Sequence, residues 1–171
     1  MIEVIDNFLD MESYGNMQRA LTDEKFPWTF NNCITNSTET DSVGQFVHLL
    51  YKPNFGIDSQ WFKFFIPALG NKLCGNRTRF LLSAKMNLNP RQGRNIRLGD
   101  YHTDCNIPGG SHKTAIYYYN TNNGYTEFET GEKVESVANR VVVFDGNTKH
   151  VGHACTDQQV RILININYLL L

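Results

Sequence analysis

The sequence lacks an excess of charge of either sign: 16 lysine and arginine residues face 17 aspartate and glutamate residues, for a net charge of -1. A nearly neutral chain has no global field to gather nucleic acid or an anionic membrane surface. It also lacks an apolar run of transmembrane length, and residues 1–6 have neither the basic nor the apolar region of a signal peptide. We therefore expect no membrane partner and a cytoplasmic protein.

Cysteine is scarce as well, with four residues at Cys33, Cys74, Cys105 and Cys155. They show neither C-x-x-C spacing nor the density of a disulfide framework, so we expect reduced thiols. Internal repeats, low-complexity segments and linkers are likewise absent from the sequence. The length and the ordinary composition indicate a single globular domain over residues 1–171.

What the chain does contain is a series of short patterns typical of strands joined by turns. We expect strands at residues 2–6, 45–51, 80–88, 114–119, 125–128, 134–137, 141–144 and 161–168. Two helical segments accompany them. One is capped by Asp10, and the other spans residues 61–73 and ends at Gly75, with Pro67 either kinking it or splitting it in two.

Two polar segments lie between these elements. Residues 31–42 have no apolar period and are predicted to form a long loop, either a lid over an active site or a plain surface connection. Residues 89–100 are predicted to form a turn-rich loop. Within residues 77–97 every charged residue is basic, which indicates either a patch for an acidic peptide or nucleic acid backbone, or a solvated loop.

The pattern that carries chemistry is His102-Thr103-Asp104. On an extended strand, residues two apart point to the same face, as two ligands of one metal require. A second imidazole would complete a 2-His-1-carboxylate triad, which holds Fe(II) and leaves the opposite face open; zinc can occupy the same ligand types. His150 follows a hydrophobic strand and a turn, and Arg161 begins the last strand, where a buried arginine needs an anionic partner.

Through His102-Thr103-Asp104, the strand at 114–120 and the pair of His150 and Arg161, the chain resembles the Fe(II)- and 2-oxoglutarate-dependent dioxygenases. The likeness is to the prolyl-4-hydroxylase-like branch, with its small bacterial and phage members, and it extends weakly to residues 4–9. It implies a mainly β protein with flanking helices. The fold implied is a double-stranded β-helix, the cupin-like jelly roll, with the N-terminal helices packed on the outside of one sheet.

On this resemblance, His102, Asp104 and His150 bind Fe(II), and 2-oxoglutarate and O2 are cosubstrates. Arg161 would hold the far carboxylate of 2-oxoglutarate, with the Tyr118 hydroxyl as a second donor. The implied reaction hydroxylates an unactivated C–H bond and converts 2-oxoglutarate to succinate and CO2, with ascorbate as a candidate reductant. Asp104 favours hydroxylation, because halogenating relatives replace this carboxylate by a small residue.

Four other residues were candidates for a role near this site. His153 also precedes Arg161 and is the alternative to His150 as the distal ligand, or else a residue behind the ligands or on the surface. His48 is expected to be a bonded strand histidine and His112 a loop residue. Cys105 adjoins Asp104 and is expected to be its neighbour, not a ligand.

The substrate is the least determined part of the prediction. A prolyl residue in a peptide or protein is the first expectation on the resemblance, and other protein side chains, a free amino acid or a nucleobase stay open. The chain has Asn89 and Asn123-Gly124 where many relatives have a tyrosine and a glycine pair. Two other classes compete: a non-catalytic ligand-binding module of the same fold, and a cupin-like metal enzyme that does not use 2-oxoglutarate, which would leave Arg161 unexplained.

Overall fold

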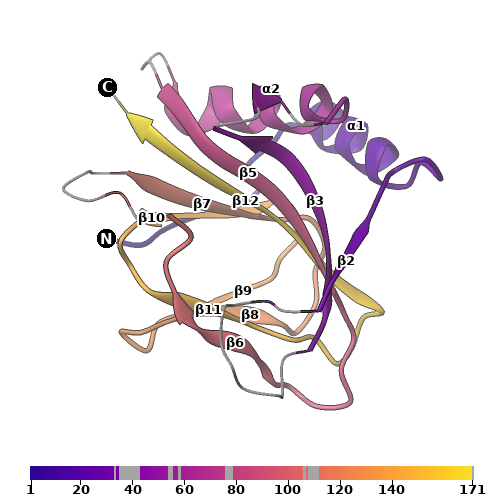
Figure 1. The fold of residues 1–171 in the computed structure, drawn as a ribbon, viewed down its shortest axis with the longest axis vertical. Helices are drawn as coiled ribbons and strands as arrows, with labels where there is room; N and C mark the ends of the chain where they lie inside the picture. Colours follow the sequence, from indigo (N-terminus) through magenta and orange to yellow (C-terminus); the bar gives the residue numbers. More distant parts are fainter. Residues whose placement is uncertain are drawn as a thin grey trace.

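Two facing β-sheets and two helices make up the described part of the chain in this computed structural model, which covers residues 1–32, 34, 43–53, 56–57, 59–75, 79–105, 107 and 112–170 (Figure 1). The larger sheet runs, in spatial order, through β1 (Glu3–Ile5), β10 (Arg140–Asp145), β7 (Lys113–Tyr118), β12 (Val160–Leu170), β5 (Arg79–Pro90), β3 (Gln45–Lys52) and β2 (Thr29–Asn31), with β4 (Gly56–Ile57) paired to β3. The smaller sheet runs through β6 (Arg97–His102), β11 (His150–His153), β8 (Tyr125–Phe128) and β9 (Lys133–Glu135).

The second half of the chain passes back and forth between the two sheets. β6 lies in the smaller sheet, β7 in the larger, β8 and β9 in the smaller, β10 in the larger, β11 in the smaller and β12 in the larger. All the paired strands are antiparallel. This winding is the double-stranded β-helix that the sequence led us to expect, so the predicted fold is confirmed.

Helices α1 (Met11–Leu21) and α2 (Phe62–Cys74) cover the face of the larger sheet that points away from the smaller sheet (Figure 1). Asp10 caps α1 as predicted, because its carboxylate accepts a hydrogen bond from the Ser13 amide at 2.8 Å. Pro67 lies inside α2 without splitting it, and Gly75 ends this helix with a φ of +54°. Neither helix is long and apolar enough to cross a membrane.

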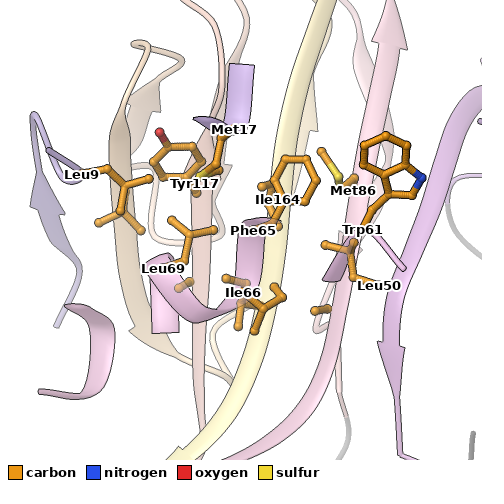
Figure 2. Close-up of a cluster of buried hydrophobic side chains, with 14 of the residues drawn as sticks. Leu9, Met17, Leu50, Trp61, Phe65, Ile66, Leu69, Met86, Tyr117 and Ile164 are labelled. Carbon is orange, nitrogen blue, oxygen red and sulfur yellow. The ribbon is translucent and has the colours of Figure 1, made fainter. Parts of the chain in front are cut away.

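The main hydrophobic core lies between these helices and the sheet. Ile164 of β12 packs among side chains of both helices, including Met17 and Phe65, as Figure 2 shows. Its neighbours Ile162 and Ile166 face the same way and are also buried. Burying each such side chain stabilises the fold by about 1.5–3 kcal/mol, so the alternation of β12 anchors the helices to the sheet, as the sequence predicted.

A second, smaller apolar cluster lies between the two sheets. It contains Ile116, Tyr118, Phe128, Val134, Val142, Phe144 and Leu163. The rest of the space between the sheets is lined largely by polar side chains and forms the cavity described below. The protein therefore has an apolar side, under the helices, and a mixed side, between the sheets.

The predicted bounds of the loop at residues 89–100 were wrong at both ends. β5 continues to Pro90, and β6 begins at Arg97. The polar, turn-rich composition hid β6, which is held by pairing with β11 and is irregular around Gly99, where φ is +86°. β2 and β4 were not predicted, and β9 spans Lys133–Glu135 where residues 134–137 were expected. Of the predicted loop at 31–42, residues 33 and 35–42 lie outside the described residues.

Candidate active site

Strand pairing in the smaller sheet brings two imidazoles together. His102 is the last residue of β6 and His150 the first of β11, and the two are direct partners in the ladder. Their ring centroids lie 5.0 Å apart. Asp104 follows just after the end of β6, so it sits beside His102 from a bend and not from the strand itself.

The three side chains can hold one metal ion. One ligand atom from each lies within 4.8 Å of the other two. His102 Nε2 is 3.9 Å from Asp104 Oδ1, and His150 Nε2 is 3.5 Å from Asp104 Oδ2. Two ligands at right angles around an ion with bonds of about 2.1 Å would lie about 3 Å apart, so the three side chains would have to move closer together on binding it. Cys105 is not part of this group and instead lies 3.8 Å from Ser83 Oγ.

Hydrogen bonds on the far side of each ring orient the ligand atoms. His102 Nδ1 lies 2.8 Å from the Asp100 carbonyl oxygen, and His150 Nδ1 lies 3.3 Å from that of Thr148. A carbonyl only accepts, so Nδ1 carries the proton in each ring and Nε2 keeps its lone pair for a metal. Both Nε2 atoms are the ones that approach Asp104.

The Asp104 carboxylate is held from one side only. Asn165 Nδ2 donates to Asp104 Oδ1 at 2.9 Å, whereas Asp104 Oδ2 is buried without a hydrogen-bond partner. A buried carboxylate oxygen without a partner is costly unless a cation binds it. The donor set and this unpaired oxygen fit a resident divalent metal.

Burial keeps His150 ready for a metal. Only 3% of the residue is exposed, and Phe144 packs edge-on against its ring with centroids 4.9 Å apart. Desolvation holds the His150 pKa below its ordinary value, although Asp104 acts in the opposite direction. The neutral ring that results is the form that binds a metal.

Arg161 is a buried cation in the same cavity. It is 1% exposed, its Nε donates to Ser136 Oγ at 2.9 Å, and its Nη2 donates to Thr126 Oγ1 at 3.2 Å. Within the described residues, no carboxylate lies within 4 Å of its guanidinium, and burial lowers the Arg161 pKa. A buried arginine held only by hydroxyls is a site for an anion.

Tyr118 packs against the Arg161 cation. The Arg161 guanidinium is 5.6 Å from the centre of the Tyr118 ring, and the Tyr118 hydroxyl donates to Thr126 Oγ1 at 2.8 Å. Burial raises the Tyr118 pKa, so the hydroxyl stays protonated. The Tyr118 hydroxyl is thus hydrogen-bonded to Thr126, a residue of the cavity lining.

Thr126 is a site residue that sequence reasoning missed. Its oxygen accepts from both Tyr118 and Arg161, so both lone pairs are used and its own proton is left to donate. Thr126 lines the cavity, where this proton can meet the anion that Arg161 attracts. Ser136, which holds Arg161 Nε, was missed as well. A single threonine or serine in a strand carries no signal in the sequence, since the contacts depend on strand packing.

Glycine 124 leaves room for this arginine. A Cβ at Gly124 would lie 2.7 Å from Arg161 Cδ and 2.8 Å from Asn122 Oδ1. Of the Asn123-Gly124 pair, a departure from the resemblance, Gly124 therefore packs against Arg161, whereas Asn123 is exposed and donates to Thr156 Oγ1 at 2.7 Å. Asn89, the other departure, lines the cavity beside Arg161, its cross-strand partner.

The remaining histidines lie outside the metal group. His153 pairs with Glu127 at 2.7 Å and stacks on Tyr125, with ring centroids 4.2 Å apart. As expected of a strand histidine, His48 is hydrogen-bonded through both ring nitrogens. Its Nδ1 lies 2.7 Å from the Pro27 carbonyl oxygen, and its Nε2 lies 2.7 Å from Ser59 Oγ. His112 is buried against Gly146, and residues 108–111 before it lie outside the described residues.

The basic stretch at 77–97 does not form one surface. Lys85 lines the cavity, whereas Arg97 is exposed and pairs with Asp100 at 3.4 Å. Arg77 lies outside the described residues. The cavity itself is lined by the three metal-binding candidates together with Arg161.

Comparison with known proteins identifies the fold. No protein-family model matches the chain, and no curated protein matches it. Among solved structures, an oxidoreductase of the 2OG-Fe(II) oxygenase family from Burkholderia pseudomallei superposes with a TM-score of 0.66 at 8% identity, over 98% of this chain and 84% of that one. The chain has the fold of the iron- and 2-oxoglutarate-dependent oxygenases.

Two further structures with this fold are prolyl hydroxylases. One, from Trichoplax adhaerens, is in complex with a hypoxia inducible factor peptide fragment, with a TM-score of 0.64 and 15% identity over 98% of this chain and 83% of that one. The other is a viral collagen prolyl hydroxylase from Paramecium Bursaria Chlorella virus-1 in complex with 2OG, with a TM-score of 0.56 and 14% identity over 98% and 94%. At such identities the likeness establishes the fold, and function is argued from the site.

Proposed function

We propose that this protein is an Fe(II)- and 2-oxoglutarate-dependent dioxygenase that hydroxylates an unactivated C–H bond. One observation carries the proposal: the buried guanidinium of Arg161 opens into the same cavity as His102, Asp104 and His150 and has no carboxylate partner among the described residues. A metal triad and an unpaired buried cation in one cavity suit a chelating dicarboxylate.

In this proposal, His102, Asp104 and His150 hold Fe(II) through Nε2, a carboxylate oxygen and Nε2. When bound, the metal with 2-oxoglutarate and O2 supplies the oxidising chemistry, which releases succinate and CO2 and places a hydroxyl on the substrate. The protein fixes the ligands. Asn165 holds Asp104 in place, and the carbonyl contacts of the two rings set their tautomers.

Arg161 binds the far carboxylate of 2-oxoglutarate, and Thr126 adds the donor proton that its two accepted hydrogen bonds leave free. The role first predicted for Tyr118, direct donation to the cosubstrate, becomes an indirect one in this proposal. Its ring supports the guanidinium and its hydroxyl orients Thr126.

We further propose a peptide or protein as the substrate, with a prolyl residue as the first choice. The support is the sequence resemblance, together with the Trichoplax adhaerens prolyl hydroxylase of the same fold, which was solved with a peptide fragment. Ascorbate is the proposed reductant. We also propose that residues 1–171 act as one domain in the cytoplasm.

The rival functions lack such support. A non-catalytic binding module has no need of a metal triad combined with an anion site. A cupin-like metal enzyme without 2-oxoglutarate leaves Arg161 as a buried cation with no purpose.

The test is turnover of the cosubstrate. Purified protein is supplied with Fe(II), ascorbate and 2-oxoglutarate in air, and succinate is measured, with His150→Ala as the inactive comparison. We expect succinate from the native protein in an amount that depends on both Fe(II) and 2-oxoglutarate. Succinate formation that His150→Ala leaves intact would show that the triad is not the catalytic centre.

A further inference from the structure

The cavity wall formed by β5 carries polar groups that the proposed reaction leaves unused. Lys85, Asn87 and Asn89 alternate along β5 and all line the cavity. Asn89 donates to Gln45 Oε1 at 3.3 Å. Asn87 is only 9% exposed, and its Oδ1 is buried without a hydrogen-bond partner. Burying an amide oxygen unpaired costs about 1–3 kcal/mol, which indicates that a ligand binds here.

Lys85 is the second cation of this cavity. Among the described residues, no acidic side chain lies within 4 Å of its ammonium group. Its direct partner on β12 is Asn165, the residue that donates to Asp104. The backbone of Lys85 is therefore level with that of the residue that holds the Asp104 carboxylate.

Lys85 and Arg161 enter the cavity from different positions along the sheet. Arg161 pairs with Asn89, four residues along β5 from Lys85, which places the two backbone positions about 13 Å apart along the sheet. The far carboxylate of 2-oxoglutarate is assigned to Arg161. Lys85 is then available to another group that approaches the metal.

Charge balance points to the nature of that group. Fe(II) and Arg161 together carry as much positive charge as Asp104 and the two carboxylates of 2-oxoglutarate carry negative charge. The positive charge of Lys85, a half-buried residue of the cavity lining, is left over in this count. An anionic group on the substrate would compensate it.

We propose that Lys85 and Asn87 form a binding subsite for a carboxylate of the substrate, close to the C–H bond that reacts. The subsite rests on the proposed oxygenase function and narrows it to acidic substrates. Lys85 supplies the charge and the Asn87 amide a hydrogen bond, while the unpaired Oδ1 atoms of Asn87 and Asn165 can accept from an N–H group beside the carboxylate. Two sources share this chemistry: a free amino acid, and an acidic residue within a peptide.

The first experiment uses matched pairs of probes. Native protein with Fe(II), 2-oxoglutarate and O2 is assayed for succinate formation with each free amino acid and its amide, and with tripeptides that differ only in a central aspartate or asparagine. We expect an acid to accelerate succinate formation and its amide to have little effect. Response to free acids identifies a small substrate, and response to aspartyl peptides alone identifies an acidic side chain. If no acid responds, or amides respond equally, the carboxylate subsite is refuted.

The second experiment assigns the effect to Lys85. In Lys85→Met we expect the half-saturating concentration of the active acid to rise about 10- to 100-fold, as for the loss of a hydrogen bond to a charged group. The half-saturating concentration of 2-oxoglutarate should stay unchanged. Lys85→Arg should retain most of the response, and Asn87→Asp should weaken it by repulsion.

Lys63→Met is the matched control, because it removes the same charge from the outer side of α2, where Lys63 lies over the Phe64 ring. Lys63→Met should change the half-saturating concentration of neither the acid nor 2-oxoglutarate. If Lys85→Met raises the half-saturating concentration of 2-oxoglutarate and leaves that of the acid unchanged, Lys85 binds the cosubstrate and the inference is wrong.

The failure of this inference can be told from that of the oxygenase proposal. Under anaerobic conditions, Fe(II) and 2-oxoglutarate should give the native protein and Lys85→Met the visible absorption of a chelated keto acid. Absence of that absorption from the native protein would refute the oxygenase proposal. If the native protein shows this absorption but no acid accelerates its succinate formation, only the carboxylate subsite is refuted.

Discussion

The two faces of β12 have different roles, one in the hydrophobic core and one in the cavity. Ile162, Ile164 and Ile166 point to the helices and join a continuous apolar core. Arg161 and Asn165 point between the sheets, where they are equally buried but line a cavity. One strand thus supports stability on one side and a polar site on the other.

The difference lies in whether burial leaves polar groups unsatisfied. Beneath the helices, Ile162, Ile164 and Ile166 carry no polar atoms, and among the described residues of that core only the indole nitrogen of Trp61 is buried without a hydrogen-bond partner. Between the sheets, Asp104 Oδ2, Asn87 Oδ1 and Asn165 Oδ1 are buried without partners, and Arg161 has no described counter-ion. Unpaired polar groups cost stability in the absence of a ligand, so the inner face indicates where ligands bind. Four substitutions test this comparison.

The largest effect is expected on the helix-covered face. Ile164→Ala removes a fully buried side chain from the centre of the core in Figure 2 and should lower the free energy of unfolding by about 2–5 kcal/mol. Denaturant unfolding measures this loss. Ile57→Ala, at a position that is 62% exposed, is the control and should change it by less than about 0.5 kcal/mol. Equal effects would remove the basis for distinguishing this face as the stabilising core.

Arg161→Met should weaken ligand binding without lowering the stability of the protein. It removes a buried cation, so 2-oxoglutarate binding should weaken about 10- to 100-fold, as for a lost charged hydrogen bond. Stability without ligands should stay unchanged or rise by about 1 kcal/mol, because Met requires no counter-ion. Anaerobic titration and denaturant unfolding measure the two quantities. A large loss of stability with unchanged binding would make Arg161 a structural residue.

Gly124→Ala should act on the same anion site through packing. The added methyl group would lie 2.7 Å from Arg161 Cδ and 2.8 Å from the His153 carbonyl oxygen. Both the Arg161 side chain and the backbone of β11 must then shift, which should weaken 2-oxoglutarate binding about tenfold. The titration used for Arg161→Met measures it. Gly93→Ala is the matched control, because no atom lies within 4 Å of its added Cβ. Unchanged binding in Gly124→Ala would show that the position of Arg161 is not critical.

The smallest effect is expected at an exposed ion pair that belongs to neither face. Arg140 Nε and Nη2 donate to the two oxygens of the Asp6 carboxylate, at 2.6 and 3.0 Å, and the hydrogen bond from Arg140 lowers the Asp6 pKa. A lowered pKa stabilises the folded state above the ordinary pKa of aspartate, and the contribution disappears as the pH falls through the lowered value.

Asp6→Asn should therefore be slightly less stable than the native protein at neutral pH, with the difference vanishing in acid. Thermal unfolding at several pH values measures it. A difference that grows as the pH falls would contradict the assigned pKa shift.

Much of the fold could be predicted from local patterns. The capped helix after Asp10, the alternating strands and the apolar face of β12 are all written in short stretches of sequence. β6 could not be predicted in this way, because its strand state depends on pairing with β11, some 50 residues away, and its composition resembles a loop. The jelly-roll winding came from the resemblance and not from any single pattern.

The site divides in a similar way. His102, Asp104, His150 and Arg161 have distinctive chemistry, and the spacing of the first two could be read directly. The contacts of Thr126 and Ser136 with Arg161 span 35 and 25 residues and involve ordinary hydroxyls, so no local signal revealed them. The inward direction of Lys85 depended on the register of β5 with β12, which the sequence did not specify.

The central claim is that the cavity between the two sheets binds a metal and a keto acid together. Its most direct test is an anaerobic titration of metal-free protein. Fe(II) is added first and 2-oxoglutarate second, and the visible charge-transfer absorption of the chelated keto acid is recorded for the native protein and His150→Ala. We predict the absorption in the native protein and its loss in His150→Ala. Native protein that binds Fe(II) but develops no absorption with 2-oxoglutarate would contradict the account.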